Sequence, residues 1–311
     1  MGTLVGHVAP GFGFFVIGLW HLLNHIKLHA QNPSTYTSLA WFPTSKMRYL
    51  ELYLIMFGCT ASISMELFIG PDRHQPFDPD GTIPSNHLHN FEHSAISLTF
   101  FTYAAFAIIL DKLKPKAEYA LLQVLGAIAF AQQFLLFRLH STDHMGVEGQ
   151  YHYLLQVVIF VSLATTLLGI NYRKSFINSF VRSASIIFQG LWFMLMGFML
   201  WTPQLIFKGC YMNMEEGHLV ERCHSDEYVH RAKALVNLQF SFFLILVTIF
   251  STTIYLFLDK FCGEKVEYQR LTKEDQEEGE DVESQTKRKL LDDSKSFIHI
   301  GKAFGPTDFE R

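Results

Sequence analysis

The residues of this sequence with the clearest chemical potential are its histidines, 15 in number, several of which stand at helical spacing beside acids. His89, Glu92 and His93 are related as i, i+3 and i+4, so on a helix they would share one face. His140 and His144 also have the i, i+4 spacing. Imidazole and carboxylate are ligands that suit Zn²⁺, and imidazole titrates near neutral pH. The spacing is therefore compatible with a metal site, a hydrogen-bonded polar layer or a proton relay.

The elements that must position these groups are long apolar segments. The chain has 311 residues, of which 49% are hydrophobic and 17% are charged, whereas a soluble domain carries about 25% charged residues. Seven segments have the roughly 17–25 mostly apolar residues that a spanning helix needs. The predicted fold is all-α: a seven-transmembrane-helix bundle over residues 1–259, followed by a disordered acidic cytosolic tail over residues 260–311. The predicted spans are approximately 8–25, 49–69, 91–110, 117–139, 152–170, 184–202 and 235–258.

Composition also excludes several classes of protein. The formal net charge of -4 offers no basic surface for nucleic acid. Four cysteines in so long a chain do not make a disulfide-stapled secreted domain. The lipid bilayer is the partner that these numbers predict, and nucleic acid is not.

Basic residues in the short loops predict the orientation of the chain. Lys and Arg concentrate in loops on the cytosolic side of a membrane. This rule places the N-terminus outside and the C-terminus in the cytosol. The loops that carry the basic residues hold Lys27, Lys46, Arg48, Lys112, Lys114, Lys116, Arg173, Lys174 and Arg182.

This orientation gathers most histidines at the outer end of the bundle. His7 opens the first span, Glu66 lies near the outer end of the second, and His152 opens the fifth. An ionisable residue inside a span costs roughly 2.5–3.5 kcal/mol, so Glu66 and Glu92 need partners, which clustered imidazoles or a bound Zn²⁺ would supply. The alternatives are a hydrogen-bonded plug and a proton relay. The candidate metal ligands are His7, Glu66, His89, Glu92, His93, His140, His144 and His152.

A second polar group stands at the inner end of the first two spans. Trp20, His21 and His25 are typical of the aromatic and polar belt at a membrane interface. Glu51 and Arg48, three residues apart, are interpreted as a local ion pair. Neither group is predicted to be a site.

The cysteines and the tail carry three further signals. Cys210 and Cys223 fall in the outer loop before the last span, where an oxidising compartment favours a disulfide between them. Cys262 follows the last span directly, a usual position for palmitoylation. Tyr268 and Leu271 have the spacing of a tyrosine-based sorting signal that a clathrin adaptor would bind. That signal predicts a post-Golgi endomembrane or plasma-membrane protein.

Several separated motifs occur in order along the chain. They are Gly6-His7-Val8-Ala9-Pro10-Gly11, Gly18-Leu19-Trp20, Glu66, His93, the stretch from His140 to His152-Tyr153-Leu154-Leu155, and Gln189-Gly190-Leu191-Trp192-Phe193. Together they resemble the transmembrane protein 45 family over approximately residues 1–260, and residues 49–53 and 140–144 resemble its plant branch. The resemblance implies a seven-span protein without an assigned molecular activity, with plant members linked to defence. It also implies that His140 and His152 are more widely shared than His144.

Three functions follow from these residues. The first is a non-enzymatic membrane protein whose outer polar layer is structural or binds a metal. The second is a metal-dependent intramembrane hydrolase, and the third is a proton- or ion-coupled transporter. Convergence of Glu66, His93, His140 and His152 on one point would favour a metal over a plug.

Overall fold

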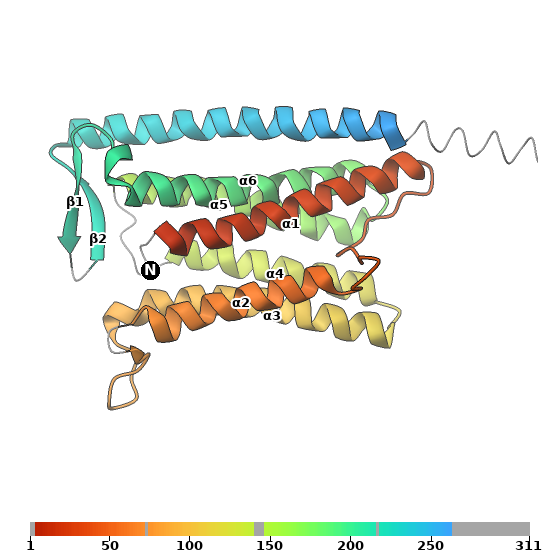
Figure 1. Ribbon diagram of the computed structural model, residues 1–311, viewed down its shortest axis with the longest axis horizontal. Helices are drawn as coiled ribbons and strands as arrows, with labels where there is room; N and C mark the ends of the chain where they lie inside the picture. The colour runs from red at the N-terminus through yellow and green to blue at the C-terminus, as the bar shows by residue number, and fades with distance from the viewer. Residues whose placement is uncertain (1–3, 72–73, 140–145, 216–217, 263–311) are drawn as a thin grey trace, which may run out of the picture. The chain divides into compact units, whose positions relative to one another are not determined.

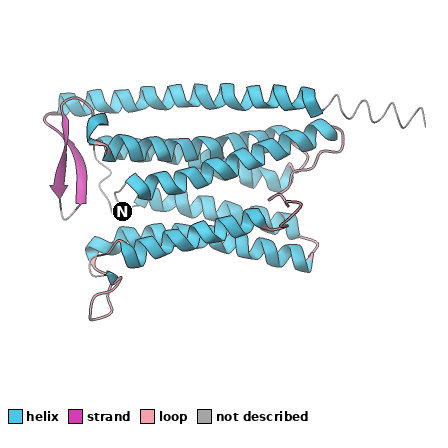
Figure 2. Ribbon diagram, in the orientation of Figure 1, coloured by secondary structure: helices cyan, strands magenta, loops and turns pink. Residues whose placement is uncertain are grey.

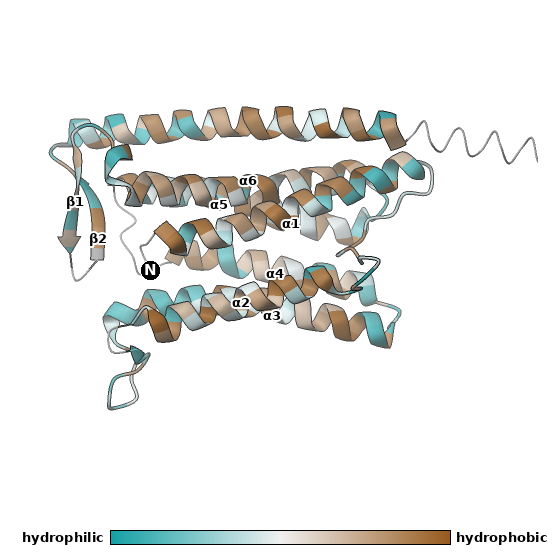
Figure 3. Cartoon of the chain, in the orientation of Figure 1, coloured by the Kyte–Doolittle hydropathy of each residue, from teal (hydrophilic) through white to brown (hydrophobic). Residues whose placement is uncertain are grey.

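The computed structural model describes residues 4–71, 74–139, 146–215 and 218–262. Within these ranges, seven helices are long and apolar enough to cross a membrane, which confirms the predicted all-α, seven-span class (Figures 1 and 2). Figure 3 shows how strongly apolar residues dominate the helices. The helices are α1 (Leu4–Gln31), α2 (Leu50–Ser64) with a π-helical turn (Met65–Ile69), α3 (Leu88–Leu113), α4 (Glu118–Leu139), α5 (Gly146–Asn171), α6 (Phe176–Trp201) and a last helix (Asp226–Cys262).

Several helices extend beyond the apolar runs that predict them. The fifth span was expected from residue 152 but α5 begins at Gly146, and the last helix begins nine residues before the predicted 235. Backbone hydrogen bonds continue past the lipid boundary, whereas hydropathy marks only the apolar part. Local chemistry fixes other ends: the Ser175 side chain caps α6 by accepting from the Asn178 amide at 3.2 Å.

The closest helix pair is α1 with α6, which run alongside each other (Figure 1). Glycines make this approach possible. A Cβ on Gly190 would lie 2.3 Å from the Phe15 amide nitrogen, and a Cβ on Gly18 would lie 2.6 Å from the Ile187 amide nitrogen. Small residues of this kind let helix backbones pack tightly in membranes, where lipid gives no hydrophobic drive for association.

The other helices pack in chain order, α2 on α3, α3 on α4, α4 on α5 and α5 on α6. The main core is apolar and aromatic, with Trp192 and Tyr151 fully buried in it. The Trp192 indole N–H donates to the Tyr151 backbone carbonyl at 3.1 Å, which ties α6 to α5 and gives this buried donor a partner.

A β-hairpin joins α6 to the last helix, where the sequence pattern predicts only a loop. Strands β1 (Cys210–Glu215) and β2 (His218–Cys223) pair antiparallel, and β2 packs against α5 (Figure 2). The described residues up to Asp259 form one compact unit.

Candidate functional site

We use the term histidine layer for His7, Glu66, His93 and His152, which come from α1, the π-helical turn, α3 and α5. Glu66 is the acidic residue of this layer and is 7% exposed. The Glu66 carboxylate accepts a hydrogen bond from Asn90 Nδ2 at 2.8 Å and lies 3.2 Å from His93 Nδ1. A buried acid near one membrane face thus has an amide and an imidazole as partners.

The π-helical turn presents Glu66 to these partners. The Gly70 amide donates to the Met65 carbonyl at 2.8 Å, a bond that spans five residues instead of four. Such a turn contains an extra residue and changes the direction of the side chains within it, and it is frequent at functional sites. No sequence signal marks this turn, because its residues would fit an ordinary helix equally well.

The other two imidazoles of the layer lie close together. His152 Nδ1 is 3.0 Å from the Glu148 carbonyl oxygen, and because that oxygen only accepts, Nδ1 carries the proton. The His7 ring stacks on Trp201 at 4.4 Å and lies 6.2 Å from the His152 ring, measured between centroids. Phe137 stands between the two halves of the layer, 5.9 Å from His152 and 6.4 Å from His93.

The remaining candidate ligands have different outcomes. His89 is buried with its ring 6.2 Å from that of His93, and Glu92 is half-buried on α3. His140 and His144 lie outside the described residues. Within the described ranges, no three groups of the histidine layer bring ligand atoms within 4.8 Å of one another.

The opposite end of the bundle corrects the local pair predicted for Glu51 and Arg48. The buried Glu51 carboxylate accepts from Trp20 Nε1 at 3.0 Å, His21 Nε2 at 2.7 Å and the Phe42 amide at 2.9 Å. These donors come from α1 and from the loop before α2, so Glu51 holds that loop against the helices.

Arg48 instead pairs with an acid 63 residues further along the chain. Its Nε and Nη2 each donate to Asp111 at 2.9 Å, and the Tyr49 hydroxyl donates to the same carboxylate at 2.8 Å. The hydrogen bond and the charge of Asp111 raise the pKa of Arg48. A contact across this separation has no signal in local spacing.

The interface belt expected at Trp20, His21 and His25 is also wrong for the two histidines, which lie inside the bundle at 6% and 0% exposure. His25 Nε2 is 3.4 Å from Arg182 Nη2, and since Arg182 only donates, His25 accepts there and is neutral. Arg182 also donates to Gln123 Oε1 at 3.0 Å and to the Leu39 carbonyl at 3.3 Å. Among the described residues, this buried guanidinium has no carboxylate partner.

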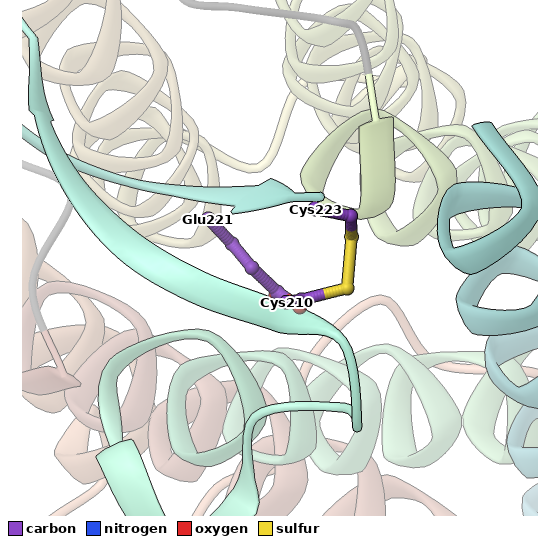
Figure 4. A group of neighbouring side chains, drawn as sticks. All are labelled: Cys210, Glu221 and Cys223. Carbon is purple, nitrogen blue, oxygen red and sulfur yellow. A yellow bond between two sulfur atoms is a disulfide. The ribbon is translucent and has the colours of Figure 1, made fainter. Parts of the chain in front are cut away.

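The β-hairpin holds a third cluster. Its two cysteines were predicted from the sequence, but its acidic residue was not. A disulfide joins Cys210 to Cys223, as expected for an oxidising compartment. Glu221 lies beside it and is 4% exposed (Figure 4). Burial, and then the charge of Glu148, raise the pKa of Glu221 to about 7. No local sequence pattern singles out Glu221, because Leu219-Val220 and Glu221-Arg222 do not alternate between apolar and polar residues.

The signals of the tail lie mostly beyond the described part of the chain. Tyr268 and Leu271 fall outside it. Cys262 is the final residue of the last helix, and its thiol is not in a disulfide. The sorting signal and the lipidation site stay predictions.

These observations define a class first: a multi-pass integral membrane protein with seven spans. Within that class, the model of a family of unknown function (DUF716) matches residues 119–256, from the start of α4 into the last helix. The chain is thus similar to a family of unassigned activity over its second half. The expected resemblance to the transmembrane protein 45 family remains an expectation.

Proposed function

We propose that the protein binds a transition-metal ion, Zn²⁺ for this donor set, within the histidine layer. His7, His93 and His152 would be the ligands, and Glu66 would orient His93. One observation carries the proposal: His93 and His152 each place Nδ1 against an oxygen, from the Glu66 carboxylate and from the Glu148 carbonyl. Metal-binding histidines almost always engage their second nitrogen in this way, so that the first keeps its lone pair for the ion.

The separation of two of the three proposed ligand rings is compatible with this assignment. A Zn–N bond is about 2.0–2.1 Å, so two imidazoles that face one tetrahedral ion have centroids roughly 5–6 Å apart. The 6.2 Å between His7 and His152 is close to that range. Glu66 becomes a hydrogen-bonding partner in place of the direct ligand that the sequence suggested.

Charge balance gives a second argument. A carboxylate inside a span is costly, and the His93 imidazole 3.2 Å from Glu66 is one group that can offset its charge. A metal cation bound to His93 would place positive charge next to Glu66 without protonation of either side chain. In the competing structural interpretation, hydrogen bonds alone hold these groups and the layer is a plug.

Elemental analysis of the detergent-purified, non-reduced protein tests the proposal. We expect about one Zn per chain in the wild type and its loss in His93→Ala/His152→Ala. The matched control is His29→Ala, at the opposite end of the bundle, which should keep the metal. Glu66→Gln should weaken binding roughly 10- to 100-fold. Size exclusion and thermal unfolding check that each variant folds.

Two results would end the metal proposal in favour of the plug. One is a wild type that takes up no metal after dialysis against Zn²⁺. The other is a folded double variant that retains its metal.

One observation favours a metal-dependent hydrolase as a second candidate. An apolar groove of about 280 Å³ lies on α1 and α6, with Val8 and Phe198 among its lining residues. His7 is on the same stretch of α1, with its Cβ 2.9 Å from where a Cβ on Gly197 would lie. A metal-bound water could attack a substrate that enters from lipid. Chelator-sensitive hydrolysis of a lipid ester or amide, lost in His152→Ala, would support this candidate.

The transporter alternative is not favoured. A cation that crosses the bundle between its two polar ends would meet the guanidinium of Arg182, which is 5% exposed. A fixed buried arginine is an electrostatic barrier to cations in membrane pores. The proposed ion therefore stays at the histidine layer.

The cellular part of the proposal places the N-terminus outside and the tail in the cytosol of a post-Golgi or plasma membrane. A clathrin adaptor would bind Tyr268 and Leu271. Tyr268→Ala should then shift a tagged protein toward the cell surface in internalisation assays. An unchanged distribution would remove the adaptor from the list of partners.

A further inference from the structure

Glu221 is a buried acid with no visible reason to be buried. Both carboxyl oxygens are inaccessible and have no hydrogen-bond partner among the described residues. The strand register pairs Cys210 with Cys223 and Met212 with Glu221, so the acid and the disulfide share one face of the hairpin (Figure 4). The ligand atoms of Cys210, Glu221 and Cys223 all lie within 4.8 Å of one another.

An unpaired buried carboxylate is costly, and its surroundings make this one worse. Burying an ionised group without a partner costs far more than a hydrogen bond returns. The nearby charge that acts on Glu221 is that of Glu148, which is also negative. The missing partner must therefore be positive, either a proton or a metal cation. The sulfurs of a disulfide carry no charge and cannot help to hold a cation.

We propose that reduction of the Cys210–Cys223 disulfide converts this corner of the hairpin into a metal site. The two thiolates and the Glu221 carboxylate would bind a soft divalent cation of the Zn²⁺ class, with water as the fourth ligand. Thiolates select such ions over Mg²⁺ or Ca²⁺, and two sulfurs, one oxygen and a water make a tetrahedral zinc set. The disulfide and the metal exclude each other.

The chemistry balances with a dithiol as reductant. The protein disulfide takes up two electrons and two protons to become two thiols, and the dithiol is oxidised to its own disulfide. Metal binding then releases both thiol protons to solvent and changes no oxidation state. Opening the S–S bond lets the sulfurs separate to the roughly 3.5–4 Å that two Zn–S bonds of about 2.3 Å require.

The hairpin prearranges this site. Backbone pairing holds Cys210 opposite Cys223 whether or not the disulfide is closed. On the other face, Arg222 pairs with Glu215 through bonds of 2.9 and 2.5 Å. This ion pair does not involve the cysteines, so it can still link the two strands after the disulfide is reduced. The site shares no residue with the histidine layer, so either proposal can fail alone.

Co²⁺ titration of the full-length protein in detergent tests the proposal. The protein is reduced with a dithiol, freed of it by anaerobic gel filtration, and compared with the non-reduced protein. A cobalt–thiolate charge-transfer band should appear with one equivalent of Co²⁺, and only after reduction. Cys210→Ser/Cys223→Ser should abolish the band. Glu221→Gln should weaken Co²⁺ binding at least tenfold, with thiol content unchanged.

Two control variants sharpen the result. Glu227→Gln removes an exposed acid from the start of the last helix, outside the hairpin, and should leave Co²⁺ affinity unchanged. His93→Ala/His152→Ala should keep the band, because the histidine layer supplies no thiolate. Absence of the band after reduction would overturn the proposal. So would equal affinity in Glu221→Gln, or a band that persists without Cys210 and Cys223 and so comes from other thiols.

Discussion

At the residue scale, three buried carboxyl groups differ in the hydrogen bonds that they accept. Glu51 accepts from three donors, Glu66 has an amide and an imidazole, and Glu221 has no hydrogen bond within the described residues. Hydrogen bonds to a carboxylate favour its charged form, and burial alone favours the neutral form. The same residue type thus has several hydrogen-bond donors around it at one site and none among the described residues at another.

Glu221 should make stability depend on pH. Its pKa of about 7 in the folded protein lies above the ordinary 4.5, so its stabilising contribution is complete below about pH 4.5 and is lost as pH rises through 7. At 1.36 kcal/mol per unit, the loss is roughly 3 kcal/mol. Thermal unfolding of the non-reduced protein between pH 4 and 8 measures it. Glu221→Gln should remove this part of the pH dependence, and parallel curves for the two proteins would contradict the assignment.

Glu51 should matter through its charge and its geometry. Glu51→Gln keeps the shape but turns one acceptor oxygen into a donor facing the Trp20 indole, the His21 ring or the Phe42 amide. Leaving buried donors unsatisfied should cost about 2–3 kcal/mol. Glu118→Gln is the control, since that acid makes only a 3.5 Å pair with the exposed Lys114. Equal unfolding temperatures for the two variants would show that Glu51 is not the fastening of the loop.

At the element scale, the α1–α6 contact should depend on the absence of a methyl group at one position. Gly190→Ala would place Cβ 2.3 Å from the Phe15 backbone nitrogen, which cannot move like a side chain end. Overpacking of this kind costs about 1–3 kcal/mol. Gly13→Ala is the matched control on α1, because no heavy atom lies within 4 Å of its new methyl. There the helix propensity of Ala should stabilise by up to about 1 kcal/mol. A Gly190→Ala variant that unfolds no earlier than Gly13→Ala would refute the close contact.

The secondary-structure elements also show which parts of this fold can be predicted from the sequence. The helices follow from apolar runs of about 20 residues, because a bilayer demands that length and leaves few alternatives. The hairpin carries no such demand, and residues 218–223 show no alternation of apolar and polar residues that would mark a strand. Spacing along the sequence also does not predict the partner of an ion pair. Arg48 is three residues from Glu51 but pairs with Asp111 on α3, because helix packing determines which charges meet.

The histidine layer shows the same division between what the sequence contains and what packing decides. Position near one membrane face was enough to group His7, Glu66, His93 and His152, because alternating spans bring their ends to one side. The sequence did not indicate which of these side chains contact each other. Which nitrogen of His152 is occupied depends on the start of α5 at Gly146, six residues before the predicted span.

At the scale of the whole molecule, the seven spans make orientation a single binary choice. The loop after α2 and the loop after α1 must lie on opposite sides, because one helix separates them. The basic residues predict that the first of these loops lies outside and the second in the cytosol. Both proposed metal sites depend on this choice for their chemical surroundings, since the outside is oxidising.

Engineered glycosylation decides the orientation. Asp80→Asn completes an Asn-x-Thr acceptor with Thr82 in the exposed loop after α2, and Thr35→Asn completes one with Thr37 in the loop after α1. Only acceptors on the lumenal side are glycosylated, so Asp80→Asn should gain an endoglycosidase-sensitive shift in gel mobility and Thr35→Asn should not. The substitutions are matched, since both replaced side chains are exposed. A shift in Thr35→Asn alone would invert the bundle, and the histidine layer and the disulfide would then face the reducing cytosol.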